Sequence, residues 1–137
     1  MQISHIEHIG IAVKSLEDAI PYYENILGLK CYATEVVADQ KVKTAFFMVG
    51  QTKIELLEPT DETSTIAGFI EKKGEGIHHI AFCVDNAANA LNEMAEKGVA
   101  LIDKAPRAGA EGLQIGFLHP KSTGKVLTEL CENPNKK

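Results

Sequence analysis

The chain has 137 residues, of which 45% are hydrophobic and 24% charged, and its formal net charge is −5. This size and composition fit one globular domain, and the acidic balance argues against a nucleic-acid binder, which needs a basic face. The three cysteines form no CxxC pair, the first residues lack the pattern of a signal peptide, and no apolar run approaches the roughly 20 residues of a membrane span. We therefore expect a cytoplasmic protein without a disulfide framework.

The first half of the chain predicts a strand, a helix and three further strands. Residues 8–13 alternate and are rich in β-forming side chains, which is typical of a strand. Ser15 begins a capping box, apolar residues then recur at helical spacing, and Gly28 stands where the helix should end. The strand-like segments that follow are about 30–37, 42–49 and 53–58. The connector, about residues 59–76, predicts a short helix over 65–73.

The second half repeats this order of elements. Residues 79–84 match the first strand, Asp85 or Asn86 can cap the next helix, and Gly98 closes it. The strand-like segments that follow are about 99–103, 113–118 and 125–131. The sequence therefore predicts a single α+β domain over residues 1–137. It consists of two tandem βαβββ modules, residues 1–58 and 77–131, joined by the connector.

The pairing of the two halves also predicts which strand residues face the helices. Successive residues of a strand point to opposite faces, so bulky Ile11 and Val13 are expected to pack against the first helix. His8, Gly10 and Ala12 then share the other face. A face lined by small residues around a histidine favours a cavity over a packed core.

The duplication places two histidines and two glutamates at equivalent positions. His8 and His79 open the first strand of each half, and Glu55 and Glu129 follow them by 47 and 50 residues in the last strand. Two imidazoles and two carboxylates suit a divalent ion such as Zn, Ni, Co or Mn. Four protein ligands on an octahedral ion leave two open positions, which a Lewis-acid catalyst requires. A single strand histidine or glutamate is more simply explained as structural, but the recurrence of both residue types favours a metal centre.

Several segments together resemble a known enzyme family. They are HIEHIGIAV at 5–13, KIELLEP at 53–59, STIAGFI at 64–70, GIHHIAFCVD at 76–85, FLHPK at 117–121 and GKVLTEL at 124–130. The chain resembles the vicinal oxygen chelate superfamily, which includes glyoxalase I, extradiol dioxygenases and bleomycin resistance proteins. Within it, the chain is most similar to the methylmalonyl-CoA epimerase family, over essentially its whole length. The resemblance implies that the two modules form an incomplete mixed barrel around a metal site.

The resemblance also implies an activity and roles for individual residues. The expected reaction is interconversion of (R)- and (S)-methylmalonyl-CoA by α-proton transfer through an enolate stabilised by one Co, Mn, Ni or Zn ion, in a homodimer. The implied metal ligands are His8, Glu55, His79 and Glu129, with Glu129 and Glu55 as the candidate acid–base groups. Some relatives have Gln at the position of Glu55, and a base proposed in some members falls near Thr44, which cannot serve as one.

Lys121 is a candidate for binding an anionic group of the substrate, although a solvated turn lysine is the simpler explanation. Two other functions remain open on the same fold. One is a lactoylglutathione lyase like glyoxalase I, which would use the same ligands. The other is a metal-free resistance or binding module, although such modules typically lack the complete ligand set. A dioxygenase is less compatible with the chain, because that chemistry usually uses two histidines and one carboxylate on iron.

Overall fold

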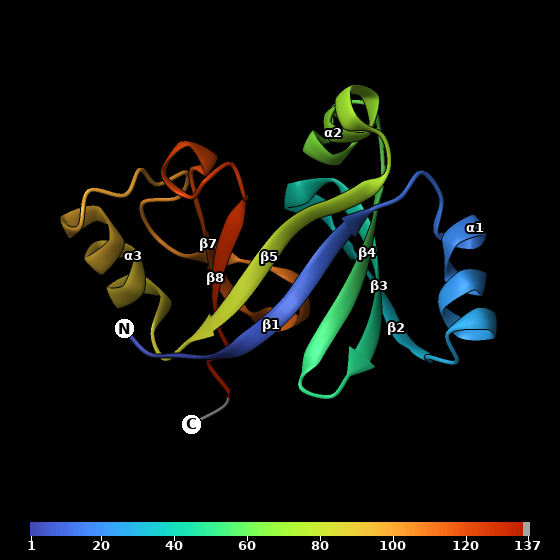
Figure 1. Ribbon diagram of the computed structural model, residues 1–137, viewed down its shortest axis with the longest axis horizontal. Helices are drawn as coiled ribbons and strands as arrows, with labels where there is room; N and C mark the ends of the chain where they lie inside the picture. The colour runs from blue at the N-terminus through green and yellow to red at the C-terminus, as the bar shows by residue number, and fades with distance from the viewer. Residues whose placement is uncertain (136–137) are drawn as a thin grey trace. The chain divides into compact units, whose positions relative to one another are not determined.

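The computed structural model describes residues 1–135, so the last two residues of the expected 1–137 domain lie outside it. The chain divides into two compact units. One unit comprises His8–His78, and the other comprises Met1–Glu7 with the chain from His79 onward. Each unit contains strands and helices, and Figure 1 labels most of them, numbered in chain order. Within the described residues, no helix has the length and apolar character that crossing a bilayer requires.

The unit His8–His78 has four strands in the order β2-β3-β4-β1. From His8 onward, β1 (Ile3–Ala12) runs parallel to β4 (Thr52–Pro59). The strand β3 (Val42–Val49) is antiparallel to β4 and to β2 (Cys31–Val37). These bounds confirm the strands expected in the first half of the chain.

The first helix of this unit is shorter than the apolar spacing predicted. The α-helix α1 covers Leu16–Pro21 and continues as a π-helical turn over Tyr22–Ile26. Pro21 has no backbone N–H, so the regular hydrogen-bond ladder cannot continue through it. The ladder resumes in a wider turn, in which the Leu27 N–H donates to the Tyr22 carbonyl at 3.1 Å. Gly28, in the left-handed region at φ 74°, ends the segment as predicted.

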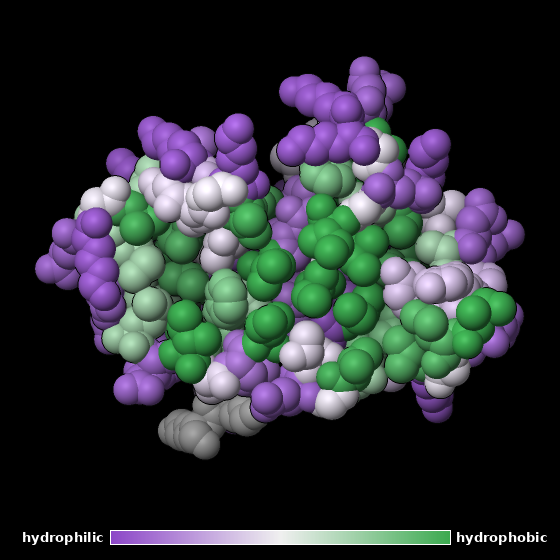
Figure 2. Space-filling model, in the orientation of Figure 1, coloured by the Kyte–Doolittle hydropathy of each residue, from purple (hydrophilic) through white to green (hydrophobic). Residues whose placement is uncertain are grey.

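The side chains between α1 and its sheet form the core of this unit. Val13, Leu16, Ala45, Phe47 and Leu56 are buried together, with Ile11 packed beside them. Ile11 and Val13 therefore face the helix, as the sequence predicted. The helix α2 (Thr65–Lys73) has its expected bounds, and Figure 2 shows a largely hydrophilic surface over it.

The other unit has the strand order β5-β8-β7-β6. In it, β5 (Gly76–Val84) contributes residues from His79 onward and runs parallel to β8 (Thr128–Glu132), while β7 (Gln114–Leu118) is antiparallel to β8. The helix α3 (Ala87–Glu96) packs on the sheet, burying Leu91 against Leu118 and Leu130. Short 3-10 turns at Ala110–Gly112 and Pro120–Ser122 flank β7, and a third, Ala38–Gln40, lies in the first unit.

The strand expected over residues 99–103 is wrong. Only Leu101 bridges to Leu118, and the short strand β6 lies later, at Arg107–Ala108. The side chain of Asp103 explains the interruption, because its Oδ2 accepts the Phe117 N–H at 2.9 Å, where a strand would place a carbonyl. The arrangement is nevertheless βαβββ in both halves, and the predicted α+β fold is confirmed.

Candidate functional site

In the unit His8–His78, a histidine and a glutamate form a buried pair on adjacent parallel strands. His8 lies on β1, and Glu55 on β4 stands opposite Gly10, two residues further along β1. The His8 Nδ1 and the Glu55 Oε2 are 3.2 Å apart. The two residues are 3% and 4% exposed, and the residue opposite Glu55, Gly10, has no side chain.

In the other unit, His79 and Glu129 form a second buried pair in the same strand register, with the other ring nitrogen facing the carboxylate. Glu129 on β8 stands opposite Ala81, again two residues after the histidine. The His79 Nε2 and the Glu129 Oε1 are 3.0 Å apart, and the residues are 5% and 3% exposed. The ring of Phe117 meets the His79 ring edge-on at 5.4 Å between centroids, which restricts the imidazole.

A second duplicated contact connects each of these strands to a helix. Glu58, three residues after Glu55, accepts the Leu16 N–H at 2.6 Å, at the start of α1. Glu132, three residues after Glu129, accepts the Ala87 N–H at 2.9 Å, at the start of α3. An odd offset along a strand reverses the face. Glu55 and Glu129 therefore lie on the face of the sheet that carries the histidines. Glu58 and Glu132 lie on the opposite face, where they bind the helices.

The duplication extends to the helix caps. The Ser15 side chain accepts the Asp18 N–H, and the Asn86 side chain accepts the Asn89 N–H. Each cap stands seven residues after the histidine of its own unit. The same type of capping hydrogen bond, at the same distance along the chain from the histidine, therefore begins the helix in each unit.

Cys131 adds a contact that sequence reasoning missed. Its buried thiol donates to the Glu129 Oε2 at 3.0 Å, while the Oε1 of that carboxylate faces His79. Glu129 and Cys131 are two residues apart on β8 and so share a face. That spacing was the available signal, and it was hidden because a single cysteine is usually only a small buried side chain.

The donors in these two pairs are of the kind that a borderline divalent ion binds. A buried carboxylate is unfavourable unless it is paired, and each glutamate here has an imidazole within 3.2 Å. Each pair offers one ring nitrogen and one carboxylate oxygen, which are ligands for Zn, Co, Ni or Mn. Each unit therefore contains a His–Glu half-site of suitable chemistry.

Comparison with known proteins places the chain in a family. The Glyoxalase/Bleomycin resistance protein/Dioxygenase superfamily profile matches residues 7–117. The chain belongs to this superfamily. Because the superfamily includes proteins of different activities, membership alone does not identify the reaction.

Two relatives and one solved structure show the narrower similarity. The chain is 47% identical over 130 residues to the uncharacterized protein YqjC of Bacillus subtilis, which covers 95% of this chain and 93% of that protein. It is 40% identical to the ethylmalonyl-CoA/methylmalonyl-CoA epimerase of Cereibacter sphaeroides, over 93% and 97% of the two chains. A methylmalonyl-CoA epimerase structure in complex with methylmalonyl-CoA and NH4+ matches at a TM-score of 0.94 and 36% identity, over 98% and 97% of the chains.

These similarities confirm the resemblance to the epimerases, and the chain is an isomerase of the epimerase class. A lactoylglutathione lyase of Salmonella typhimurium is also similar, but at 27% identity over 88% of this chain. The glyoxalase branch of the superfamily is therefore the more distant one among these relatives.

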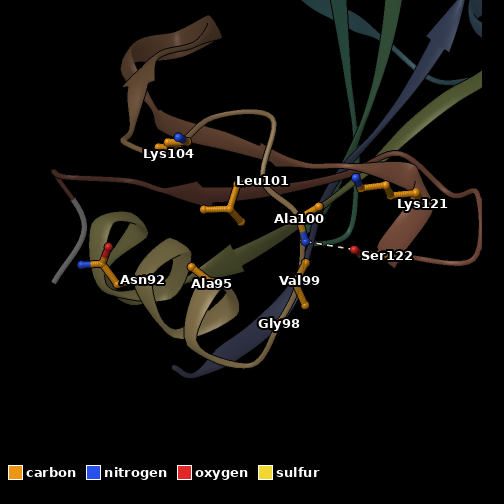
Figure 3. Close-up of a pocket in the computed structure, with 9 residues that line it drawn as sticks. All are labelled: Asn92, Ala95, Gly98, Val99, Ala100, Leu101, Lys104, Lys121 and Ser122. Atoms are coloured by element: carbon orange, nitrogen blue, oxygen red, sulfur yellow. Dashed lines mark hydrogen bonds between the residues drawn. The ribbon is translucent and has the colours of Figure 1, made fainter.

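Two further residues singled out from the sequence, Thr44 and Lys121, belong to neither His–Glu pair. Thr44 is 1% exposed on β3, between Glu35 on β2 and Leu57 on β4, and brings no carboxylate to its position. Lys121 lies exposed in the 3-10 turn after β7 and lines a cavity together with Lys104 (Figure 3).

Proposed function

We propose that this protein interconverts (R)- and (S)-methylmalonyl-CoA and that one divalent cation, Co, Mn, Ni or Zn, is required. The observation that carries the proposal is the pair of buried His–Glu half-sites in equivalent strand register, in a chain similar to methylmalonyl-CoA epimerases over nearly its whole length. The residues that would hold the cation are His8, Glu55, His79 and Glu129.

The proton to be removed lies between a thioester and a carboxylate. Glu129 would take this proton on one face of the α-carbon, because its carboxylate is held in a fixed orientation by His79 and Cys131. When bound, the cation would supply positive charge that stabilises the negative charge developing on the thioester oxygen. Glu55, carrying a proton taken from solvent, would donate that proton on the opposite face, and solvent exchange would then return both carboxyl groups to their starting protonation states. His8 and His79 would hold the cation beside the two glutamates.

The experiment is α-proton exchange followed by NMR in deuterated water. In the presence of the cation-loaded protein, we expect the α-proton of methylmalonyl-CoA to be replaced by solvent deuterium. This exchange should stop when a chelator removes the cation and resume when the cation is restored. The absence of exchange with every one of the four cations would refute the proposal.

A lactoylglutathione lyase is the second candidate, because a relative of that name aligns over 88% of this chain. The same cation-loaded protein, given the hemithioacetal of methylglyoxal and glutathione, would then form product faster than it exchanges methylmalonyl-CoA. If the protein is instead a metal-free binding module, elemental analysis of the purified protein should detect no bound divalent cation. The homodimer expected from the family resemblance is measurable by light scattering.

A further inference from the structure

A cavity of about 590 Å³ lies in the unit that carries His79 and Glu129, outside the His–Glu pair (Figure 3). It is bordered by the end of α3, the segment 98–101 and the turn after β7. Val99 and Leu101 give it an apolar surface, and Lys104 and Lys121 lie on either side of the segment that carries Leu101. Its volume is in the range of small-ligand sites.

The two lysines make the cavity positive in a chain whose net charge is −5. Within residues 1–135 neither Lys104 nor Lys121 has an ion-pair partner. The neighbouring Asp103 does not neutralise them by pairing, because its two oxygens are occupied by the Arg107 Nε at 3.1 Å and the Phe117 N–H. The Ser122 Oγ accepts the Ala100 N–H at 2.9 Å, so its own proton is available to a ligand.

The strand register places this cavity at the same end of the sheet as the catalytic pair. Leu118, the last residue of β7, stands opposite Thr128, which directly precedes Glu129 on β8. The turn that carries Lys121 and Ser122 begins two residues after Leu118. The cavity lies on the face of the sheet that α3 covers, whereas Glu129 lies on the opposite face. A substrate whose reacting carbon lies at Glu129 would therefore pass around the end of the strands near Thr128 before its phosphates reach the cavity.

We infer that the cavity binds the phosphate-bearing nucleotide end of an acyl-CoA. The inference rests on the proposed function for its substrate, and it adds a second site on the same molecule. The adenine ring would lie on Val99 and Leu101, and the phosphates would meet Lys104 and Lys121 in charge-assisted hydrogen bonds. The long pantetheine arm separates this end of the substrate from the reacting carbon.

The test compares two substrates that share the reacting group. Methylmalonyl-CoA carries the nucleotide, whereas methylmalonyl-pantetheine lacks it. In the double variant Lys104→Ala/Lys121→Ala, we expect the KM for the CoA thioester to rise roughly fivefold to tenfold relative to the KM for the pantetheine thioester, because two exposed charge pairs are lost. The control is Lys30→Ala/Lys72→Ala, which removes the same charge from exposed positions outside the cavity.

Binding of adenosine 3′,5′-bisphosphate, measured by calorimetry, tests the cavity without turnover. The wild type should bind it, the cavity variant should bind it roughly fivefold to tenfold more weakly, and the control variant should bind like the wild type. Equal changes for both thioesters, or unchanged nucleotide affinity in the cavity variant, would overturn the inference. If the wild type turns over neither thioester but shows the expected nucleotide binding, the proposed function fails while the cavity assignment stands.

Discussion

Glu129 is a buried carboxylate with a contact at each of its two oxygens. One oxygen faces the His79 Nε2 at 3.0 Å and the other accepts the Cys131 thiol at 3.0 Å, while Ala81 opposite it is too small to displace it. A carboxylate oriented in this way loses little freedom when it transfers a proton. This fixed orientation supports the acid–base role that we propose for Glu129.

Replacing Glu129 with Gln should separate binding from proton transfer. The amide keeps the shape and an oxygen donor, so cation binding measured by calorimetry should persist in part. The α-proton exchange should fall by about 10²–10⁴-fold, because no base remains at this position. Glu132→Gln, on the same strand but the opposite face, is the control. Near-normal deuterium incorporation by Glu129→Gln would contradict the assigned role.

Replacing Cys131 tests whether its thiol orients Glu129. Cys131→Ala removes the donor, and we expect kcat for epimerisation to fall roughly threefold to tenfold, the value of one hydrogen bond. Cys131→Ser retains a donor and should recover most of the loss. Cys31→Ala removes a thiol that donates a hydrogen bond to the Ala33 carbonyl in the other unit, and it should leave kcat unchanged. Equal loss in the Ser and Ala variants would point to packing alone.

Among individual residues, the sequence predicted those that occur at equivalent positions in both halves. The pairs His8–Glu55 and His79–Glu129 followed from matching strands in the two halves, and the structure places the members of each pair together. Cys131 occurs in one half only, so comparison of the halves could not reveal it. Lys104 follows a segment that was expected to be a strand, which hid its place at the cavity.

The two helices depend on carboxylates from neighbouring strands. Glu58→Gln and Glu132→Gln should each lower the free energy of unfolding by about 1 kcal/mol, because a charged acceptor at a helix N-terminus is replaced by a neutral one. Urea denaturation measures this. Glu62→Gln, at an exposed loop position, is the control and should change little. A loss no larger than the control would show that these hydrogen bonds add nothing to stability.

Gly116 permits the close approach of α3 to β7. A Cβ at this position would lie 2.6 Å from the Leu91 Cδ1, and Leu91 is fully buried. We expect Gly116→Ala to destabilise the protein by about 1–3 kcal/mol in thermal unfolding. Gly68→Ala, in α2 with nothing within 4 Å, should instead stabilise by roughly 0.5–1 kcal/mol. If both variants shifted the melting temperature in the same direction, the steric explanation would fail.

Elements with explicit boundary signals were predictable, and those set by tertiary hydrogen bonds were not. Ser15 and Asn86 begin the two helices where the sequence predicted, and Gly28 and Gly98 end the two helical segments. The π-helical turn after Pro21 depends on how the chain resumes hydrogen bonding once an N–H is missing. The lost strand at 99–103 depends on a side chain that replaces a backbone acceptor. Neither effect has a periodic pattern in the sequence.

For the whole molecule, the proposed cation links the stability of the chain to its chemistry. An ion that binds only the folded state stabilises it by about 2.7 kcal/mol at a hundredfold excess over its Kd. We expect Co²⁺ or Mn²⁺ to raise the melting temperature and a chelator to reverse the rise. His79→Ala should abolish most of the shift, whereas His5→Ala, outside the proposed ligands, should keep it. A wild-type melting temperature insensitive to all four cations would exclude a shared centre.

The contacts that occur in both halves allow equivalent positions of one polypeptide to be compared with each other. Each half has its own histidine, its own glutamate paired with that histidine, and its own glutamate that accepts the first N–H of a helix. The same substitution can therefore be made twice in one polypeptide, at His8 and at His79 or at Glu55 and at Glu129. Any difference between the two outcomes measures how unequally the two halves contribute to the cation binding and proton transfer that we propose.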